Sequence, residues 1–224
     1  MIRLNKVSLC LGNANPDDPV LFSLPSFTVK AGEAVALIGP SGCGKSTLLN
    51  LIAGLHRSDY GEVEVAGVEL KSLSSAKLDH HRGTHCGMVF QTFHLLAPFT
   101  ALENVLIGQS FGGRQKDKTR QRAKDVLVRV GLEDRLEARP HQLSVGECQR
   151  VAIARAIISN PKIVLADEPT GSLDPQTAEE IFDLLMKISS EDKRTLIMVT
   201  HDLSLAGQFP RSFDCSGLIK SERS

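Results

Sequence analysis

Short apolar runs separated by longer helical patterns occupy most of the chain. Residues 86–90, 163–166 and 196–199 are apolar at nearly every position, which is typical of strands buried on both faces. Because helical patterns separate these runs, the strands are expected to lie parallel to one another. The pattern therefore predicts an α/β fold with a parallel core.

The N-terminal part of the chain has a different pattern. Residues 2–11 and 26–30 alternate or cluster like strands, and the turn-forming segment 12–19 (GNANPDDP) separates them. Residues 61–67 alternate apolar and polar positions like an edge strand, and a last strand is expected at 213–219. We predict an antiparallel β subdomain at this edge of the fold.

A largely helical block lies between Pro98 and Pro161. Helical spacing covers residues 100–111, 116–130 and 144–159, with a polar face on the second of these segments. There is no internal repeat and no linker long enough to divide domains. We therefore expect a single domain, 1–224, with a helical lobe inserted at about 98–160.

Composition narrows the partners and the compartment. Lys plus Arg and Asp plus Glu number 26 each, so bulk charge does not favour nucleic acid, and we expect no such partner. No apolar run approaches the roughly 18 to 20 residues that span a bilayer, and the N-terminus does not resemble a signal peptide. Five dispersed cysteines argue against a disulfide framework or a zinc site and suit a reducing cytosol.

Residues 39–47 carry the strongest chemical signal, because GPSGCGKST fits the phosphate-loop pattern G-x-x-x-x-G-K-[ST]. An apolar strand pattern precedes the loop and a helical pattern follows it, as the motif requires. Backbone N–H groups and the helix start can bind phosphates, while the loop's lysine reaches the terminal phosphates and its first hydroxyl binds Mg²⁺. A glycine-rich turn that binds nothing is the alternative, which this context disfavours. The predicted phosphate contacts are Gly39, Pro40, Ser41, Gly42, Cys43, Gly44, Lys45, Ser46 and Thr47.

A second constellation ends the apolar run at 163–166. Asp167 follows the run and could lie near the Mg²⁺ shell, with Glu168 beyond it, where a base could orient water at a terminal phosphate. Alone, an acidic pair before Pro169 could equally be a turn or a helix cap. The upstream phosphate loop favours the catalytic interpretation.

A segment at 143–150, LSVGECQR, completes an ordered set of motifs along the chain. With it, the sequence resembles the ATP-binding cassette ATPases over essentially its full length. The resemblance implies a P-loop ABC ATPase fold with a mixed sheet core, an antiparallel β edge subdomain and an inserted helical lobe. The motifs that carry it are 39–47, Phe90-Gln91-Thr92, 143–147, Asp167-Glu168, Ser172-Leu173-Asp174 and Thr200-His201-Asp202.

The resemblance implies a role for each motif residue in ATP hydrolysis with Mg²⁺. Glu168 corresponds to the general base, His201 to the residue that hydrogen-bonds the γ-phosphate, and Gln91 to the residue that touches the metal and the attacking water. Taken singly, Gln91 could be a surface amide and His201 a structural histidine. We interpret the other six histidines as structural, including those of a polar stretch at 80–85 that we expect to be exposed. The implied metal site is Ser46, Gln91 and Asp167, and the implied nucleotide contacts beyond the phosphate loop are Ser144, Gly146 and Asp174.

The segment beginning at Ser144 also matches a capping box, with Ser144 at the N-cap and Glu147 at N3. In the resembled family this serine faces the nucleotide of a second copy, so two chains must stack head to tail. Val145 stands where Gly is commonest, and Glu147 where Gln is usual; a carboxylate there repels phosphate unless it folds back onto the Ser144 N–H. The family's aromatic residue that stacks on the base has no counterpart near Leu11, so we expect loose base selectivity.

The resemblance is to the branch that serves lipoprotein release, macrolide-type efflux and cell-division permeases. It implies an ATP-hydrolysing subunit that powers a separate integral-membrane permease and lies peripherally on the cytoplasmic face of the inner membrane. Residues 91–105 are expected to form the docking surface, unless their apolar side chains only pack the lobe. One alternative is a regulatory or mechanotransmission subunit that moves no substrate. A soluble cassette ATPase acting on DNA or ribosomes is a weaker alternative, because such proteins generally carry coiled coils or two fused cassettes.

Overall fold

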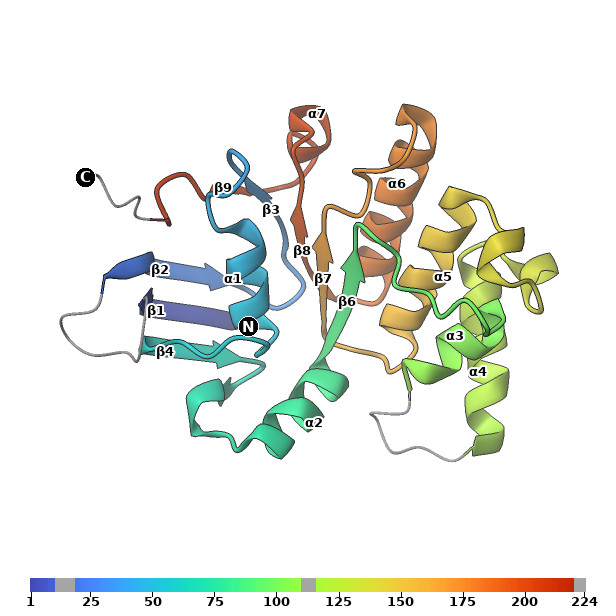
Figure 1. Ribbon diagram of the computed structural model, residues 1–224, viewed down its shortest axis with the longest axis horizontal. Coiled ribbons are helices and arrows are strands. Elements are labelled where there is room, and N and C mark those ends of the chain that lie inside the picture. The colour runs from blue at the N-terminus through green and yellow to red at the C-terminus, as the bar shows by residue number, and fades with distance from the viewer. Residues whose placement is uncertain (11–18, 110–115, 220–224) are drawn as a thin grey trace.

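Two sheets organise the molecule (Figure 1), and the computed structural model describes residues 1–10, 19–109 and 116–219. The antiparallel sheet has the order β2-β1-β4-β5, and the parallel sheet the order β6-β7-β8-β3-β9. The mixed strand directions expected of the fold are thus divided between two sheets. The strands are β1 (Ile2–Cys10), β2 (Val20–Val29), β3 (Ala34–Ile38), β4 (Tyr60–Val65), β5 (Val68–Glu69), β6 (Cys86–Phe90), β7 (Ile163–Asp167), β8 (Thr195–Val199) and β9 (Ser212–Asp214).

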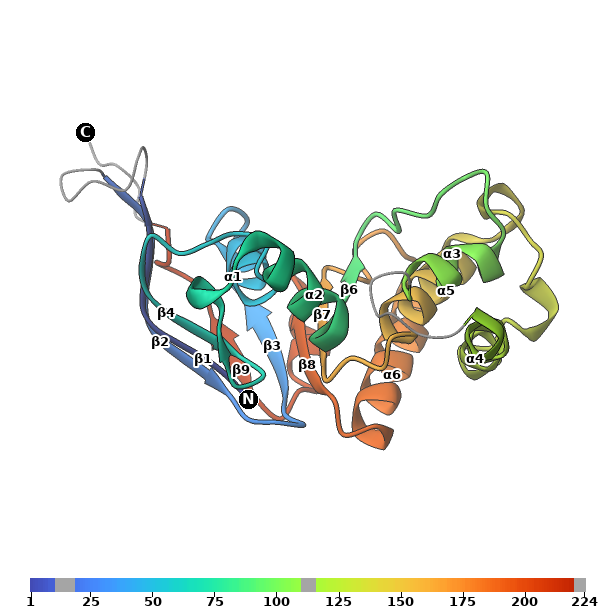
Figure 2. The same ribbon diagram turned by 90° about the horizontal axis from the view of Figure 1, so that it is seen from below.

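The helices divide between the two faces of the parallel sheet (Figure 2). Helix α1 lies between the antiparallel and parallel sheets, while α3, α4, α5 and α6 lie beyond the other face. None of the described helices combines the length and the apolar character that crossing a membrane would require. The helices are α1 (Lys45–Ile52), α2 (Ser75–His85), α3 (Ala101–Ile107), α4 (Lys116–Arg129), α5 (Val145–Ile157), α6 (Pro175–Glu191) and α7 (Leu203–Ala206).

The central strands are buried on both faces because successive side chains enter different cores. In β7, Leu165 packs with α1 and the antiparallel sheet, whereas Ala166 packs with the helices of the other face. In β8, Ile197 and Met198 divide in the same way. This two-sided burial is the physical reason that these strands are apolar at consecutive positions instead of alternating.

Two predicted strand boundaries were wrong. Strand β2 begins at Val20 instead of residue 26 and continues through Pro25, which an edge strand tolerates because its missing N–H has no ladder partner to satisfy. The last strand, expected at 213–219, ends at Asp214. There the Asp214 carboxylate accepts a hydrogen bond from the Ser216 N–H (2.8 Å) and the chain turns. The predicted turn at 12–19 falls almost entirely outside the described residues.

The polar stretch containing three histidines is helical and partly buried. Helix α2 places Leu78 and His81 in the interior, and the Nε2 atom of His81 lies 3.1 Å from the Val65 carbonyl oxygen. Burial lowers the pKa of His81. The expectation of an exposed stretch was therefore wrong for His81, whose ring contacts the carbonyl of Val65 at the end of β4.

Side-chain caps set the starts of two lobe helices, α3 and α5, and of α6. Thr100 and Glu103 form a reciprocal capping box on α3, and Ser144 and Glu147 form another on α5. Helix α6 begins after Asp174, whose carboxylate accepts from the Thr177 N–H (3.0 Å). The structure describes the first predicted helix as ending at Ile107, and residues 110 and 111 of that prediction lie outside the described residues.

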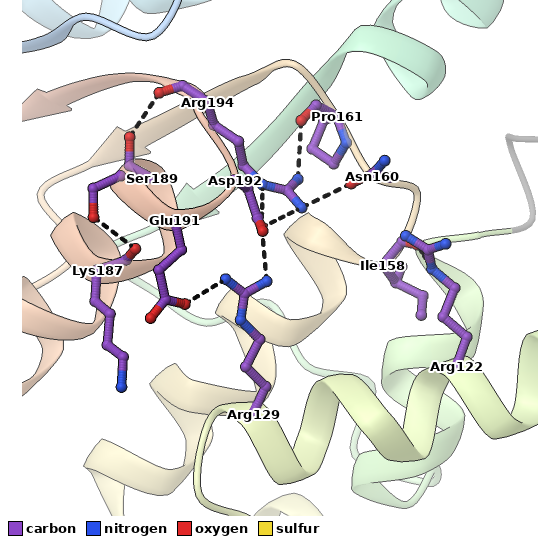
Figure 3. A network of polar contacts seen from close by, with 11 residues as sticks. Arg122, Arg129, Ile158, Asn160, Pro161, Lys187, Ser189, Glu191, Asp192 and Arg194 are labelled. Carbon is purple, nitrogen blue, oxygen red and sulfur yellow. Dashed lines mark hydrogen bonds and ion pairs between the residues drawn. The ribbon is translucent and has the colours of Figure 1, made fainter.

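A polar network joins α4 to the end of α6 and the start of β8 (Figure 3). The Arg129 guanidinium of α4 donates to Asp192 (2.7 Å) and to Glu191 (3.0 Å). Arg194, 4% exposed, donates to the same Asp192 carboxylate (2.8 Å). Asp192 therefore lies between two guanidinium groups and connects the helical lobe to the sheet.

Candidate functional site

The motif residues gather because the strands that precede them end in register. Across the parallel sheet, Phe90 pairs with Asp167, Asp167 with Val199, and Val199 with Leu37. The residues that follow these positions therefore emerge at one edge, the carboxyl edge, where parallel α/β sheets bind ligands. Gln91, Glu168, His201 and the loop at 39–47 all leave the sheet at this edge.

The loop at 39–47 presents free backbone donors at the start of α1. Gly44 is the N-cap residue with φ of 104°, and a Cβ there would lie 3.1 Å from the Phe22 ring. Among the residues that the structure describes, no side chain caps this helix, and no acidic residue occupies its first turn. The first N–H groups of α1 are therefore available for an anion, which the helix dipole also favours.

Lys45 lies across the loop that precedes it. Its side chain is buried, and Nζ donates to the Gly39 carbonyl (2.8 Å) and the Pro40 carbonyl (2.9 Å). The Cys43 thiol is also buried and lies 3.9 Å from Nζ. The ammonium group is thus held at the loop, where it can neutralise phosphate charge.

Ser46 and Asp167 come together from α1 and β7. The Ser46 hydroxyl donates to Asp167 Oδ1 over 3.1 Å. Burial raises the pKa of Asp167, although the Ser46 bond opposes that shift. Hard oxygen ligands suit Mg²⁺, and two neighbouring ligands of octahedral Mg²⁺ at about 2.1 Å lie about 3 Å apart. The spacing and chemistry of this pair therefore fit the predicted metal.

Glu168 and His201 form the second close pair at this edge. His201 Nε2 lies 2.5 Å from Glu168 Oε1, and the two side chains are 45% and 24% exposed, respectively. Glu168 has φ of +48°, a left-handed conformation that costs a non-glycine residue about 1–2 kcal/mol. Its N–H donates to the Val199 carbonyl (3.2 Å) and its carbonyl accepts from Gly171 (3.1 Å). Hydrogen bonds on both sides thus hold the strained residue with its carboxylate toward His201.

Gln91 leaves β6 beside the loop that follows β7. Its side chain is exposed, and its carbonyl accepts a hydrogen bond from the Ser172 hydroxyl (3.4 Å). The structure therefore places two of the predicted motifs, those at 90–92 and 172–174, in contact. Within the described residues, the Gln91 side chain forms no hydrogen bond with Ser46 or Asp167, so the metal role of Gln91 stays a prediction.

The predicted signature segment begins α5 on the other face of the sheet from α1. Ser144 is its N-cap, Val145 is 51% exposed, and a Cβ at Gly146 would lie 2.7 Å from the Thr177 methyl of α6. Ser144 and Gly146 thus lie beside the helix that Asp174 caps. The signature segment and the phosphate loop of one chain are separated by the sheet.

The Glu147 carboxylate folds back as the capping box requires. Glu147 Oε2 accepts from the Ser144 N–H (2.8 Å), and Oε1 accepts from Arg135 Nε (2.9 Å). The bonds to Arg135 and then to Ser144 lower the pKa of Glu147. Its negative charge is therefore paired and turned onto its own helix end, which confirms the local fold expected at this departure from the family pattern.

Sequence reasoning missed two polar residues that fix the site's loops, the buried Asn104 and the partly buried Arg155. Asn104 holds the Leu96 N–H and carbonyl (2.8 and 3.2 Å), and Arg155 donates to the Phe93 and His94 carbonyls (both 2.6 Å). Both lie in helices, at positions that belong to no recognisable motif. Leu11, where the sequence offered no aromatic residue for the base, lies outside the described residues.

The pattern that defines the ABC transporter family matches residues 23–171. This span contains the phosphate loop, the signature segment and the acidic pair. Together with the sheet edge described above, it shows that the chain belongs to the ABC transporter family. The chain is accordingly an ATP-binding protein and an ATPase of the ABC type.

Similar proteins agree with this assignment. The lipoprotein-releasing system ATP-binding protein LolD of Idiomarina loihiensis is 48% identical over 185 residues, 83% of this chain and 81% of that protein. The macrolide export ATP-binding/permease protein MacB of Bartonella henselae is 44% identical over 85% of this chain but only 29% of its own length. A dimeric structure of the ATP-binding cassette MJ0796 bound to ADP and Pi is 37% identical, with a TM-score of 0.85, over 100% of this chain and 98% of that one. The resemblance to the lipoprotein-release and macrolide-efflux branch is confirmed.

Proposed function

We propose that Glu168 is the general base of ATP hydrolysis and that His201 holds it in place. The observation that carries this proposal is the 2.5 Å contact between Glu168 and His201 at the edge where Ser46 and Asp167 also meet. A carboxylate at this position can accept a proton from water that attacks a terminal phosphate. His201 can in turn hydrogen-bond a phosphate oxygen from the same side.

The phosphate loop and the acidic strand end supply the binding part of the site. The N–H groups at the start of α1 and the Lys45 ammonium bind the phosphates, and Ser46, Asp167 and Gln91 would hold Mg²⁺. Bound there, the metal would neutralise charge on the β- and γ-phosphates. The remaining chemistry belongs to the protein: Asp167 must be ionised to act as a ligand, and Glu168 must take up the proton.

A second copy of the chain completes the site. The signature end of α5 is exposed, as the 51% exposed Val145 shows, and the sheet separates it from the phosphate loop of its own chain. MJ0796 is dimeric in its structure with ADP and Pi. We therefore propose a head-to-tail dimer in which Ser144, Gly146 and Asp174 of one chain approach nucleotide on the other. The paired Glu147 carboxylate interferes little with that approach.

The permease partner docks at a groove between the sheet and the helical lobe. This groove, of about 510 Å³, lies between α2 and β6 on one side and α3 and α5 on the other. It mixes apolar and charged lining residues, which suits an amphipathic helical segment of a membrane protein. Docking there would place this chain peripherally on the cytoplasmic face of the inner membrane. Its lining includes Leu55, Arg82, Met88, Phe90, Ile107 and Arg155.

The loop next to this groove extends the proposed docking surface. Asn104 and Arg155 hold its backbone, and this leaves Leu96 45% exposed and Phe99 40% exposed, while Leu95 packs partly against the core. Rigid apolar side chains on a hydrogen-bonded loop can bind a partner at low entropic cost. The surface expected at residues 91–105 therefore divides between docking and packing.

ATP hydrolysis by this chain drives transport. The relatives with the same catalytic core are named for lipoprotein release and macrolide export, which favours a transport motor over a regulatory subunit. We propose that the permease of this chain belongs to the same branch. In this proposal residues 1–224 form a single nucleotide-binding domain, with the helical lobe inserted at about 98–160.

Substitution of Glu168 tests the proposed chemistry. Glu168→Gln should lower ATP turnover by roughly 10² or more while ATP still binds and dimers accumulate, since the amide cannot accept the proton. Lys45→Ala should instead weaken nucleotide binding itself. Glu179→Gln is the matched control, because Glu179 lines the same cavity as Glu168 and His201. Wild-type turnover in the Glu168→Gln protein would refute the assignment of the base.

A further inference from the structure

Gln149 is a fully buried residue of α5, and its side-chain amide contacts the backbone where the chain leaves β6 and where it leaves β7. It is 0% exposed and lies five residues after Ser144, little more than one helical turn into α5. Its Nε2 atom donates to the Pro169 carbonyl over 2.8 Å and lies 3.4 Å from the Phe90 carbonyl. Pro169 directly follows Glu168, and Phe90 directly precedes Gln91.

These contacts hold the two segments that carry Glu168 and Gln91. Glu168 has the strained left-handed backbone described above, and the bond to the Pro169 carbonyl holds the peptide group between the next residue, Pro169, and Thr170. The Phe90 and Gln91 carbonyls are both held, the first by Gln149 and the second by the Ser172 hydroxyl. One side chain of α5 therefore holds the backbone at the points where the chain leaves β6 and β7.

The unpaired end of the amide indicates why Gln occupies this position. Within the described part of the chain, the Oε1 atom of Gln149 is buried without a hydrogen-bond partner, a cost that an apolar side chain of similar shape would avoid. The amide cannot reverse, because its oxygen would then face two carbonyl oxygens. Packing alone does not account for the residue, whereas its two donors do.

We propose that Gln149 is a positioning residue for ATP hydrolysis, which ties the base segment at Glu168 and the Gln91 segment to the helix that begins at Ser144. The proposal rests on the function assigned above to Glu168 and Gln91. Gln149 touches no reacting atom. It sets where the Glu168 carboxylate lies and couples that position to the signature end of α5, which the second copy of the chain engages.

Two isosteric substitutions of the full-length chain test this role. Gln149→Met removes both donors and should lower kcat roughly 10- to 100-fold, because a small misplacement of a catalytic group costs this much. KM for ATP should stay within about threefold of wild type, since the phosphate loop is untouched. Ile153→Val is the matched control: Ile153 is buried on the same helix, and its wild-type kcat should persist.

Gln149→Glu adds a readout that a purely structural role would not move. Burial raises the pKa of a carboxyl group, so the protonated acid can donate to Pro169 at low pH, whereas the carboxylate repels that carbonyl at high pH. The ratio of its kcat to that of wild type should therefore rise roughly 10-fold between about pH 8.5 and pH 6. The same ratio for Gln149→Met should stay flat, with thermal unfolding measured at each pH to verify folded protein.

Either of two results would overturn the proposal: a wild-type kcat for Gln149→Met, or a ratio for Gln149→Glu that does not change with pH. The Glu168→Gln protein separates this failure from a failure of the proposed function. If Glu168→Gln is inactive while the Gln149 variants behave like wild type, only the positioning role is wrong. If Glu168→Gln hydrolyses ATP normally, the assignment of the base fails first.

Discussion

The buried Arg194 guanidinium should contribute several times more to stability than the neighbouring Arg129. Arg194 donates to Asp192 (2.8 Å), to the Pro161 carbonyl (2.9 Å) and to the Asn160 side-chain oxygen (2.9 Å), as Figure 3 shows. Arg129 binds Asp192 from the lobe side, but its side chain is 32% exposed. Replacement of each arginine by Met keeps an apolar stem and removes the charged donors.

The burial of the two groups sets the expected magnitudes. Removal of one partner of a buried ion pair costs about 3–5 kcal/mol, and Asp192 retains Arg129 as a partner, so we expect Arg194→Met to cost about 3–4 kcal/mol. Exposed ion pairs contribute about 0.2–1 kcal/mol each, so loss of the two pairs of Arg129 should cost about 1 kcal/mol. A domain with the usual 5–15 kcal/mol of stability would remain folded in both cases.

Urea unfolding of both variants and of wild type measures this difference directly. The unfolding free energies should fall in the order wild type, Arg129→Met, Arg194→Met, with unchanged dependence on urea concentration. Equal losses in the two variants, or a loss below about 1 kcal/mol for Arg194→Met, would refute the reasoning that burial decides the cost.

Two further outcomes are expected. Burial alone would raise the pKa of Asp192, but the bonds from Arg129 and Arg194 outweigh it and leave that pKa below its usual value. The resulting stabilisation is complete above the ordinary pKa of about 3.9 and is lost as pH falls through the folded pKa. The difference in unfolding free energy between wild type and Asp192→Asn should therefore shrink on acidification. A difference that does not change with pH would contradict this. Leu96→Asp should abolish copurification with the membrane partner and partner-stimulated ATP hydrolysis while ATP binding persists. Val128→Asp, at a site on α4 that is 53% exposed, should retain both the partner and the stimulation. Retention of the partner by Leu96→Asp would place the docking surface elsewhere.

The catalytic motifs could be predicted from the sequence because each depends on local conformation. A phosphate loop needs small residues and a helix start within nine positions, and residues 39–47 contain both. The capping box at Ser144 and Glu147 is equally local, and the structure confirms it. Strands that are buried on both faces can also be predicted, because their sequences are uninterrupted apolar runs.

Elements whose stability comes from distant contacts were predicted less well. Helix α2 has too few apolar positions to show a helical period, and it is held by burial of Leu78 and His81 against other elements. Strand β2 extends through Pro25 because it lies at a sheet edge, which its own sequence does not reveal. Hydrogen-bond partners far along the chain decide such boundaries.

The sequence by itself determined the family, the phosphate loop, the acidic pair and the order of the motifs, since short-range spacing encodes them. Only the tertiary structure decided how these motifs meet. Strand register aligns Phe90, Asp167 and Val199 at one edge, and burial turns Gln149 toward the carbonyls that flank Glu168 and Gln91. The sequence shows that Gln149 lies in the segment 143–150, but its role depends on which backbone atoms the fold places beside its amide.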